Sequence, residues 1–426
     1  MINKSVLGNG IRVITERIPS IHSVALGIWV QHGSRHEPLS LSGSSHFIEH
    51  MLFKGTSARD AHSIAREIDA VGGLLNAFTS REFSCYYAKV LGDSLPFAID
   101  LLSDLLLNSI FAADELEKER RVILQELSMM HDAPDELVHE QLCAGLWKDH
   151  PLGRPVLGSH QTVSEISREQ LLSFMDDHYC GKRLLVCAAG DVDHEALVDL
   201  VGAAFGGLHP GTALSLQSPP DMHFGVDIDT RDLEQVHLCL AAPGLAQSDR
   251  QRYPFYLFNT LLGSSMSSRL FQSVREEHGL AYSIYSYLNG FSDCGAQVIY
   301  AGVAPGDVRQ AVDVILRELR DLSRNPVPED ELSAARNQLK GNLLLSLENS
   351  DNRMSRLAKD EIYFGRSIPI GDVVREIDAV TTDQVLEVTS PLMRGENLYL
   401  QLIGNVREKE IGSLDLCLDS PVRGGR

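Results

Sequence analysis

The sequence predicts an α+β protein made of two homologous domains, each a mostly antiparallel sheet packed with helices. The chain has 426 residues, which is enough for two domains that each bury a substantial core. A hydrophobic content of 43% and regular strand and helix periodicities argue against disorder. An internal repeat, and a stretch of linker composition between its two copies, indicate that the number of domains is two.

The repeat consists of short segments that recur in the same order after nearly the same interval. Tyr87-Ala88-x-Val90 and Ala98-x-Asp100 match Tyr300-Ala301-x-Val303 and Ala311-x-Asp313, Asp114-Glu115-Leu116 matches Asp330-Glu331-Leu332, Gln170 matches Gln384, and Gly190-Asp191-Val192 matches Gly404-Asn405-Val406. The intervals are 213, 216, 214 and 214 residues. We therefore expect two copies of one α+β domain, with helices on one side of each sheet.

The first half opens with Asn9-Gly10 between two short apolar runs, which is typical of a hairpin turn. The helical pattern of residues 61–71 ends at Gly72-Gly73, because glycine favours a helix end. Alternating or continuous apolar runs predict strands at residues 23–31, 74–79, 83–91 and 184–190. A period near 3.6 predicts helices at residues 95–108, 114–130, 135–147, 164–178 and 194–205.

Residues 209–225 have the composition of a linker, with Pro210, Gly211 and Pro219-Pro220 among polar residues. We therefore assign residues 1–208 to the first domain and residues 226–426 to the second. In the second domain the same patterns predict strands at residues 236–242, 281–287, 296–303 and 398–404. They predict helices at residues 253–262, 267–276, 307–322, 329–347 and 382–388.

Composition limits the partners and the compartment. A net charge of -20 disfavours nucleic acid, because phosphate binding needs a basic face. Seven cysteines form an odd set without a C-x-x-C pair, so we expect free thiols in a reducing compartment. Residues 1–7 show neither an apolar signal core nor an Arg-rich transit pattern, which predicts a cytoplasmic protein. No apolar run is long enough to span a membrane.

The segment His46-Phe47-Ile48-Glu49-His50 carries the strongest chemical signal. Ser44 or Ser45 can cap a helix that starts here. On this helix His46 and His50 lie four residues apart and Glu49 projects from the same side. Two imidazoles at this spacing can converge on a tetrahedral zinc ion, and an adjacent carboxylate can take a proton from water. The order His-x-x-Glu-His is the inverted zinc-peptidase motif. The alternative is an ordinary polar surface helix.

A zinc site needs a third protein ligand, and the helix expected at residues 114–130 offers one. Glu119 and Glu126 are two helical turns apart and share a face. Glu126 lies within an apolar run, where a carboxylate must be paired or bound to a cation. We assign Glu126 as the third ligand and Glu119 as the group that orients a ligating histidine. The alternative for Glu119 is a solvated surface charge.

The repeat tests whether these residues serve the fold or the chemistry. In the second copy, residues 259–266 correspond to the motif and contain neither His nor Glu. Asn342 and Ala335 stand at the positions of Glu126 and Glu119. The domain can therefore be built without the histidines and acids, which favours a chemical role.

The whole chain resembles the pitrilysin/insulysin superfamily of zinc peptidases, in its mitochondrial-processing-peptidase-like branch. The matching features are His46-Phe47-Ile48-Glu49-His50, Glu126 at the family spacing, Glu119, Gly55-Thr56, Gly72-Gly73-x-x-Asn76-Ala77-x-Thr79, His150-Pro151-Leu152-Gly153-Arg154 and Arg275-x6-Tyr282. The resemblance implies two halves that close like a clamshell around a chamber in which a peptide is cut. Dimers are common in this family, so it also implies a homodimer or a family-related partner subunit.

These features together predict a zinc-dependent endopeptidase that acts on peptides or on unfolded, presequence-like segments. One Zn²⁺ per chain is expected at the three ligands, with Glu49 as the general base. By resemblance, Tyr282 supplies a donor to the developing oxyanion and Arg275 binds a substrate carbonyl. Asn76-Ala77-Phe78 is expected, also by resemblance, to form an edge strand to which an extended substrate adds.

Two other functions remain compatible with the sequence. A non-catalytic scaffold or partner subunit of the same fold would be favoured by degenerate ligands, yet all of them are present. A peptide-binding or metal-storage module without turnover is disfavoured, because Glu49 would then have no task.

Overall fold

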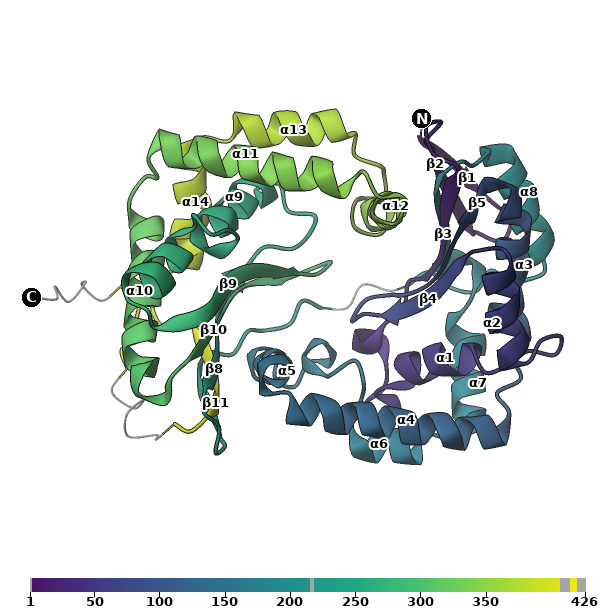
Figure 1. Cartoon of the computed structure of the whole chain (residues 1–426), viewed down its shortest axis with the longest axis horizontal. Helices are drawn as coiled ribbons and strands as arrows, with labels where there is room; N and C mark the ends of the chain where they lie inside the picture. The colour runs from purple at the N-terminus through teal and green to yellow at the C-terminus, as the bar shows by residue number, and fades with distance from the viewer. Residues whose placement is uncertain (1, 215–217, 407–413, 420–426) are drawn as a thin grey trace, which may run out of the picture. The chain divides into compact units, whose positions relative to one another are not determined.

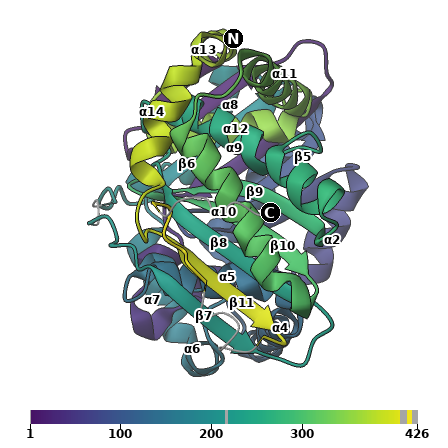
Figure 2. The same ribbon diagram turned by 90° about the vertical axis from the view of Figure 1, so that its left-hand side faces the viewer.

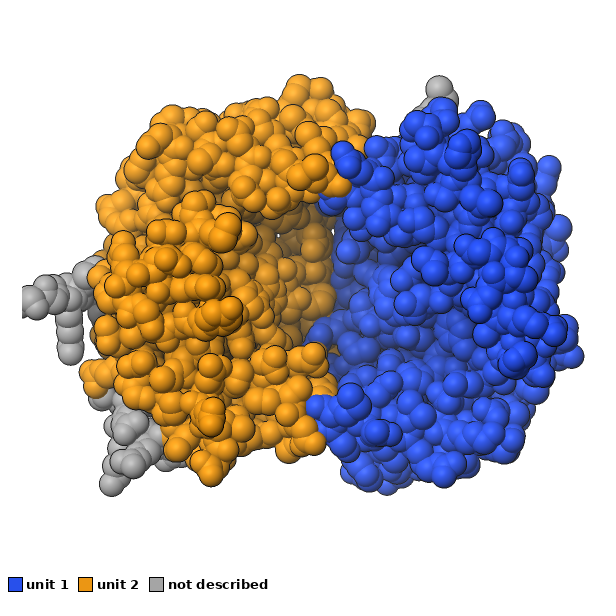
Figure 3. All heavy atoms as spheres, in the orientation of Figure 1, with its two compact units in different colours: residues 1–129, 154–217, 346–367 blue, residues 130–153, 218–345, 368–426 orange. Residues whose placement is uncertain are grey.

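The computed structural model describes residues 2–214, 218–406 and 414–419. The chain forms two compact units, which are drawn in blue and orange in Figure 3. Unit 1 comprises residues 1–129, 154–217 and 346–367, and unit 2 comprises residues 130–153, 218–345 and 368–426. Each unit contains one sheet with helices packed against it, which confirms the predicted α+β fold with two related domains.

The sheet of unit 1 has six strands in the order β1-β2-β6-β3-β5-β4. They are β1 (Ile2–Val6), β2 (Arg12–Arg17), β3 (Ser23–Val30), β4 (Leu74–Thr79), β5 (Ser84–Leu91) and β6 (Leu184–Gly190). Strands β2 and β6 pair in parallel and the other neighbours are antiparallel. The hairpin expected at Asn9-Gly10 joins β1 and β2, and β4 forms one edge of the sheet.

The alternation of side chains along β3 gives the sheet of unit 1 two buried faces. Leu26 and Ile28 face one core with α1 (Ser44–Leu52), α2 (Ala61–Ala70), α3 (Leu95–Asn108), α7 (Arg168–His178) and α8 (His194–Phe205). Figure 1 shows these helices on one side of the sheet. Trp29 faces the opposite core with α12 (Ser350–Phe364), and its indole N–H donates to Met354 Sδ at 3.3 Å. Glu361 on α12 also pairs with Lys4 on β1 at 2.7 Å.

Unit 2 repeats this arrangement with the order β7-β11-β8-β10-β9. Its strands are β7 (Gly225–Thr230), β8 (Val236–Gly244), β9 (Ala281–Gly290), β10 (Gly295–Val303) and β11 (Tyr399–Gly404). One face packs on α9 (Arg252–Gly263), α10 (Val308–Arg324), α11 (Glu329–Ser346) and α14 (Thr382–Leu392), with α13 (Ile370–Ala379) alongside. Figure 2 shows α10 lying across this sheet. The opposite face packs on α5 (Pro134–Leu146).

Helices α5 and α12 correct the expectation that helices would cover only one side of each sheet. They occupy equivalent places in the repeat, and each covers the second face of a sheet formed mainly by the other half of the chain. A sheet face rich in apolar side chains must be covered, so the exchanged helix completes each core. The predicted ranges 1–208 and 226–426, joined by a linker at 209–225, place α5 in the first domain and α12 in the second. These ranges stay a prediction.

Among the described residues, no helix combines the length and the apolar character needed to cross a lipid bilayer.

The contact of α5 with the sheet of unit 2 can be tested at Gly145. A Cβ atom placed there would lie 1.7 Å from Tyr399 Oη on β11. We expect Gly145→Ala to lower the free energy of unfolding by roughly 1–3 kcal/mol through overpacking. Gly202→Ala in α8 is the matched control, since its Cβ would meet nothing within 4 Å. We expect it to raise stability by about 0.5–1 kcal/mol. Urea denaturation measures both, and a neutral Gly145→Ala would contradict this packing.

Candidate metal centre

Helix α1 places the motif histidines on a largely buried face above the core of unit 1. Phe47 and Met51 are fully buried, while His46 and His50 are only partly exposed. The helix begins after Gly43, whose φ of 95° lies in the left-handed region that glycine adopts without strain. The expected cap by Ser44 or Ser45 is wrong, because both serines lie inside the first turn.

Helix α4 (Ala113–Asp132) brings the third predicted ligand to the histidines, and Figure 1 shows α1 and α4 side by side. Glu126 Oε2 lies 3.8 Å from His46 Nε2 and 3.5 Å from His50 Nε2. The three donor atoms all lie within 4.8 Å of one another. Ligands bound about 2.0–2.1 Å from a tetrahedral zinc ion lie roughly 3.3 Å apart, so this set fits one zinc ion after small side-chain movements.

The surroundings of Glu126 differ from the expectation in one respect. Its side chain is 38% exposed, so the expectation that a carboxylate buried in an apolar run needs a cation does not apply to Glu126. The reason is that α4 buries only a narrow stripe, which includes Leu116 and Ile123. The carboxylate is instead held toward the histidines by its place on the helix.

Burial prepares His46 to act as a ligand. Desolvation, helped by the nearby His50, lowers the pKa of His46 to about 3. The imidazole is therefore neutral near pH 7, which leaves a lone pair for a metal ion. Its buried Nδ1 has no hydrogen-bond partner within the described ranges.

Glu119 contacts the side chain of His50. Its Oε2 lies 3.0 Å from His50 Nδ1, and its Oε1 accepts a hydrogen bond from Lys54 Nζ at 2.8 Å. A proton on Nδ1 leaves Nε2 free to face Glu126. Glu119 is 5% exposed, so it is not the solvated surface charge that was the alternative.

Glu49 lies beside this group but is not part of it. Thr79 Oγ1, at the end of β4, donates to Glu49 Oε2 at 2.5 Å. Burial raises the pKa of Glu49 and the charge of Glu126 adds to the rise, while the Thr79 bond and His50 oppose it. Thr79 could have been found from the alternation along β4, which directs Ala77 and Thr79 to the face of α1.

The segment Asn76-Ala77-Phe78 lies on β4, the edge strand next to Glu49. Within the described chain, β4 pairs with β5 on one side only, so its other side can accept a peptide strand. Asn76 is exposed, and the Phe78 ring packs edge-on against Trp29 with centroids 5.5 Å apart.

Arg275 and Tyr282 lie in unit 2, whereas the candidate metal ligands lie in unit 1. Arg275 Nη1 donates to the Tyr282 carbonyl at 2.6 Å. Its guanidinium stacks on two rings, 4.8 Å from the Phe271 centroid and 4.6 Å from that of Tyr282. The Tyr282 side chain is 79% exposed. Phe271 was not among the predicted residues, because an aromatic residue in this segment carries no distinguishing pattern.

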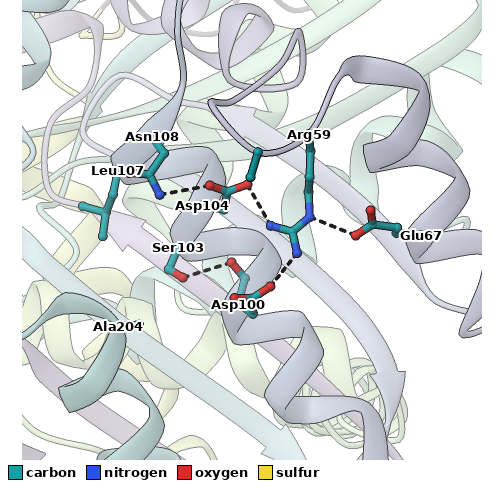
Figure 4. Close-up of a pocket in the computed structure, with 9 residues that line it drawn as sticks. Arg59, Glu67, Asp100, Ser103, Asp104, Leu107, Asn108 and Ala204 are labelled. Carbon is teal, nitrogen blue, oxygen red and sulfur yellow. Dashed lines mark hydrogen bonds and ion pairs between the residues drawn. The ribbon is translucent and has the colours of Figure 1, made fainter.

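The loop after α1 is tied to α3 around a pocket lined by acidic residues (Figure 4). The Arg59 guanidinium binds Glu67, Asp100 and Asp104 at 2.8, 2.5 and 2.7 Å. Thr56 Oγ1 donates to Asp104 at 2.7 Å, which explains the Gly55-Thr56 motif as a brace for the C-terminal end of α1. Because these acidic side chains pair with Arg59, their clustering in the pocket is explained by the packing of the loop on α3.

Comparisons with known proteins match most of the chain to one family of peptidases. The model of the family described as Insulinase (Peptidase family M16) matches residues 12–160, and that of the Peptidase M16 inactive domain matches residues 165–339. An uncharacterized zinc protease of Streptomyces coelicolor is 39% identical over 97% of this chain and 92% of its own. One from Mycobacterium tuberculosis is 42% identical over 92% of this chain and 90% of its own.

Two solved structures share the fold. A peptidase M16 inactive domain from Pseudomonas fluorescens has a TM-score of 0.89 at 19% identity, covering 95% of this chain and 98% of that chain. A protease from Helicobacter pylori has a TM-score of 0.85 at 19% identity, covering 95% and 99%.

The orienting contact of Glu119 predicts the effect of removing its charge. We expect Glu119→Gln to weaken zinc binding by about 10–100-fold, because His50 loses a charged acceptor and the amide can present its N–H₂ group to Nδ1 instead. Glu117→Gln, on the exposed side of α4, is the matched control and should bind zinc as the wild type does. Competition with a chromophoric chelator measures both affinities, and equal values for the two variants would refute the role of Glu119.

Proposed function

This chain belongs to peptidase family M16, and from that premise we propose that it is a zinc-dependent endopeptidase. The observation that carries the proposal is the convergence of His46, His50 and Glu126 within 4.8 Å, with Glu49 beside them. Relatives named zinc proteases support the metal and the hydrolase class. Assignment to the mitochondrial-processing-peptidase-like branch rests on the sequence motifs.

In this proposal the three ligands hold one Zn²⁺ per chain. Zinc supplies Lewis acidity, which polarises a carbonyl and lowers the pKa of water. Glu49 takes a proton from the attacking water on its carboxylate and passes it to the leaving amine. Burial raises the pKa of Glu49 and so makes the carboxylate a stronger base, while the Thr79 hydroxyl fixes the position of Oε2.

The substrate is proposed to be an extended peptide that adds to the edge of β4. Main-chain hydrogen bonds along Asn76-Ala77-Phe78 would bind many sequences alike, which suits unfolded or presequence-like segments. Tyr282 is proposed to donate to the developing oxyanion and Arg275 to bind a substrate carbonyl. The Nη1 of Arg275 already binds the Tyr282 carbonyl, so its remaining N–H groups would contact substrate. Cleavage inside a closed two-domain chamber is a further proposal from the resemblance.

A second candidate is a non-catalytic scaffold or partner subunit of the same fold. Of the two family models, the one described as the inactive domain matches residues 165–339, which include none of His46, His50, Glu119 and Glu126, and one solved structure that covers 95% of this chain has the same description. The ligand set of the first half is complete, which favours the enzyme.

A homodimer or family-related partner and a cytoplasmic location are proposed as well. The seven cysteines are free thiols, five of them buried, which supports a reducing compartment.

Replacing the proposed base separates metal binding from catalysis. We expect Glu49→Gln to retain zinc and to lose cleavage by at least about 10²–10⁴-fold, because the amide cannot accept the proton. Atomic absorption measures the zinc content, and a quenched fluorescent peptide library measures cleavage. Glu165→Gln, on the exposed surface of α6 (His160–Glu165), is the control and should match the wild type.

Two results would contradict this assignment. A wild-type rate in Glu49→Gln would exclude Glu49 as the base. Wild-type protein that holds zinc but cleaves no peptide of the library would favour the non-catalytic subunit.

A further inference from the structure

A buried carboxylate lies at the start of the helix that carries the motif. Glu37 is 2% exposed, and its two oxygens accept the backbone N–H groups of Gly43 and Ser45, each at 2.7 Å. The first N–H groups of a helix have no partner within the helix, and the helix dipole favours negative charge there. Glu37 therefore supplies from a separate loop the acceptors that Ser44 and Ser45 were expected to supply.

The carboxylate is costly to bury. Desolvation raises the pKa of Glu37 to about 7, against the hydrogen bonds from Ser45 and Gly43, which favour the ionised form. The nearby Arg154 guanidinium donates through Nη1 to the Glu37 carbonyl at 2.9 Å. Arg154 is the last residue of the segment His150-Pro151-Leu152-Gly153-Arg154. This segment has no role in the proposed reaction.

Backbone packing holds the same helix end from a second direction. A Cβ on Gly158 would lie 2.4 Å from the Ser42 carbonyl oxygen, and a Cβ on Gly43 would lie 2.8 Å from the Leu157 carbonyl oxygen. The two loops therefore approach more closely than side chains would allow. The helix start is fixed between the Glu37 carboxylate and the loop of residues 154–158.

The Glu37 loop is also tied to the end of β4. Ser34 N–H donates to the Ser80 carbonyl at 3.2 Å, and Arg35 N–H donates to the Arg81 carbonyl at 2.9 Å. A buried ion pair joins Arg35 to Glu82 at 2.8 Å. Thr79, which binds Glu49, directly precedes Ser80, so this loop connects the position of α1 to that of β4.

We propose that Glu37 is a positioning residue that fixes the first turn of α1 and thereby sets the geometry of the metal ligands. Ser45, whose N–H it binds, directly precedes His46. A change in the first turn moves His46 and His50 together, because a helix moves as a unit, whereas Glu126 stays on α4. This inference rests on the proposed zinc site, and it gives Glu37 and Arg154 a task that the proposed reaction does not.

The test compares two buried carboxylates of unit 1 in the full-length protein. Glu37→Gln leaves one acceptor oxygen and turns an N–H₂ group toward a helix N–H. Glu361→Gln is the matched control, since Glu361 is 5% exposed and pairs with Lys4 on the opposite face of the sheet. Three properties are measured in each: the visible spectrum with bound Co²⁺, the zinc affinity, and kcat and KM on a peptide substrate.

We expect Glu37→Gln to change the Co²⁺ spectrum, to weaken zinc binding by about 10-fold and to lower kcat with little change in KM. Glu361→Gln should keep the wild-type spectrum and affinity even where its thermal stability falls. A wild-type spectrum and affinity in Glu37→Gln would overturn the proposal, as would equal changes in both variants.

A second variant decides the case in which Glu37→Gln does not fold. Arg154→Lys removes the planar donor to the Glu37 carbonyl and should shift the Co²⁺ spectrum in a smaller degree. An unchanged spectrum in Arg154→Lys would then contradict the proposal. Wild-type protein that binds Co²⁺ but cleaves no peptide contradicts the proposed function and leaves the spectral comparison valid. Wild-type protein that binds no Co²⁺ contradicts both.

Discussion

The relative position of two helices is the constraint on which the candidate site depends. His46 and His50 come from α1 and Glu126 from α4, and a metal ion tolerates errors of only a few tenths of an ångström in its ligands. Each helix is therefore fixed by its own contacts. Phe47 and Met51 anchor α1 in the core, and Thr56 and Arg59 hold the loop that follows it through Asp104. Leu116 and Ile123 anchor α4 in the same core, and Glu119 links the two helices through His50.

The internal repeat separates what the fold needs from what the chemistry needs. The two sheets share the order of five strands, to which β1 is added at one edge in unit 1, and each has one parallel pair, β2–β6 in unit 1 and β7–β11 in unit 2. Both use a helix from the other half of the chain to cover the second face, α12 in unit 1 and α5 in unit 2. Only the first copy carries the histidines and acids. The architecture is thus the same with and without a candidate metal site, and function depends on the side chains placed on it.

Periodic features were predictable from the sequence, whereas contacts between distant loops were not. The spacing of His46, Glu49 and His50, and the two turns from Glu119 to Glu126, fixed their shared helix faces because helix geometry is local. Strand β7 was not predicted, since it directly follows the linker and its six residues include only two large apolar side chains, and α12 was not predicted either. Glu37 was missed for another reason. Its partners, Gly43 and Ser45, are reached through a loop whose course no local pattern specifies.

The central claim is that one zinc ion binds between α1 and α4. Anomalous X-ray scattering from crystals of zinc-loaded protein, recorded on both sides of the zinc absorption edge, tests it directly. The account predicts one strong anomalous peak per chain, about 2.0–2.2 Å from His46 Nε2, His50 Nε2 and a Glu126 carboxylate oxygen. A zinc-loaded crystal without a peak at these three atoms, or with its main peak elsewhere on the chain, would contradict the account.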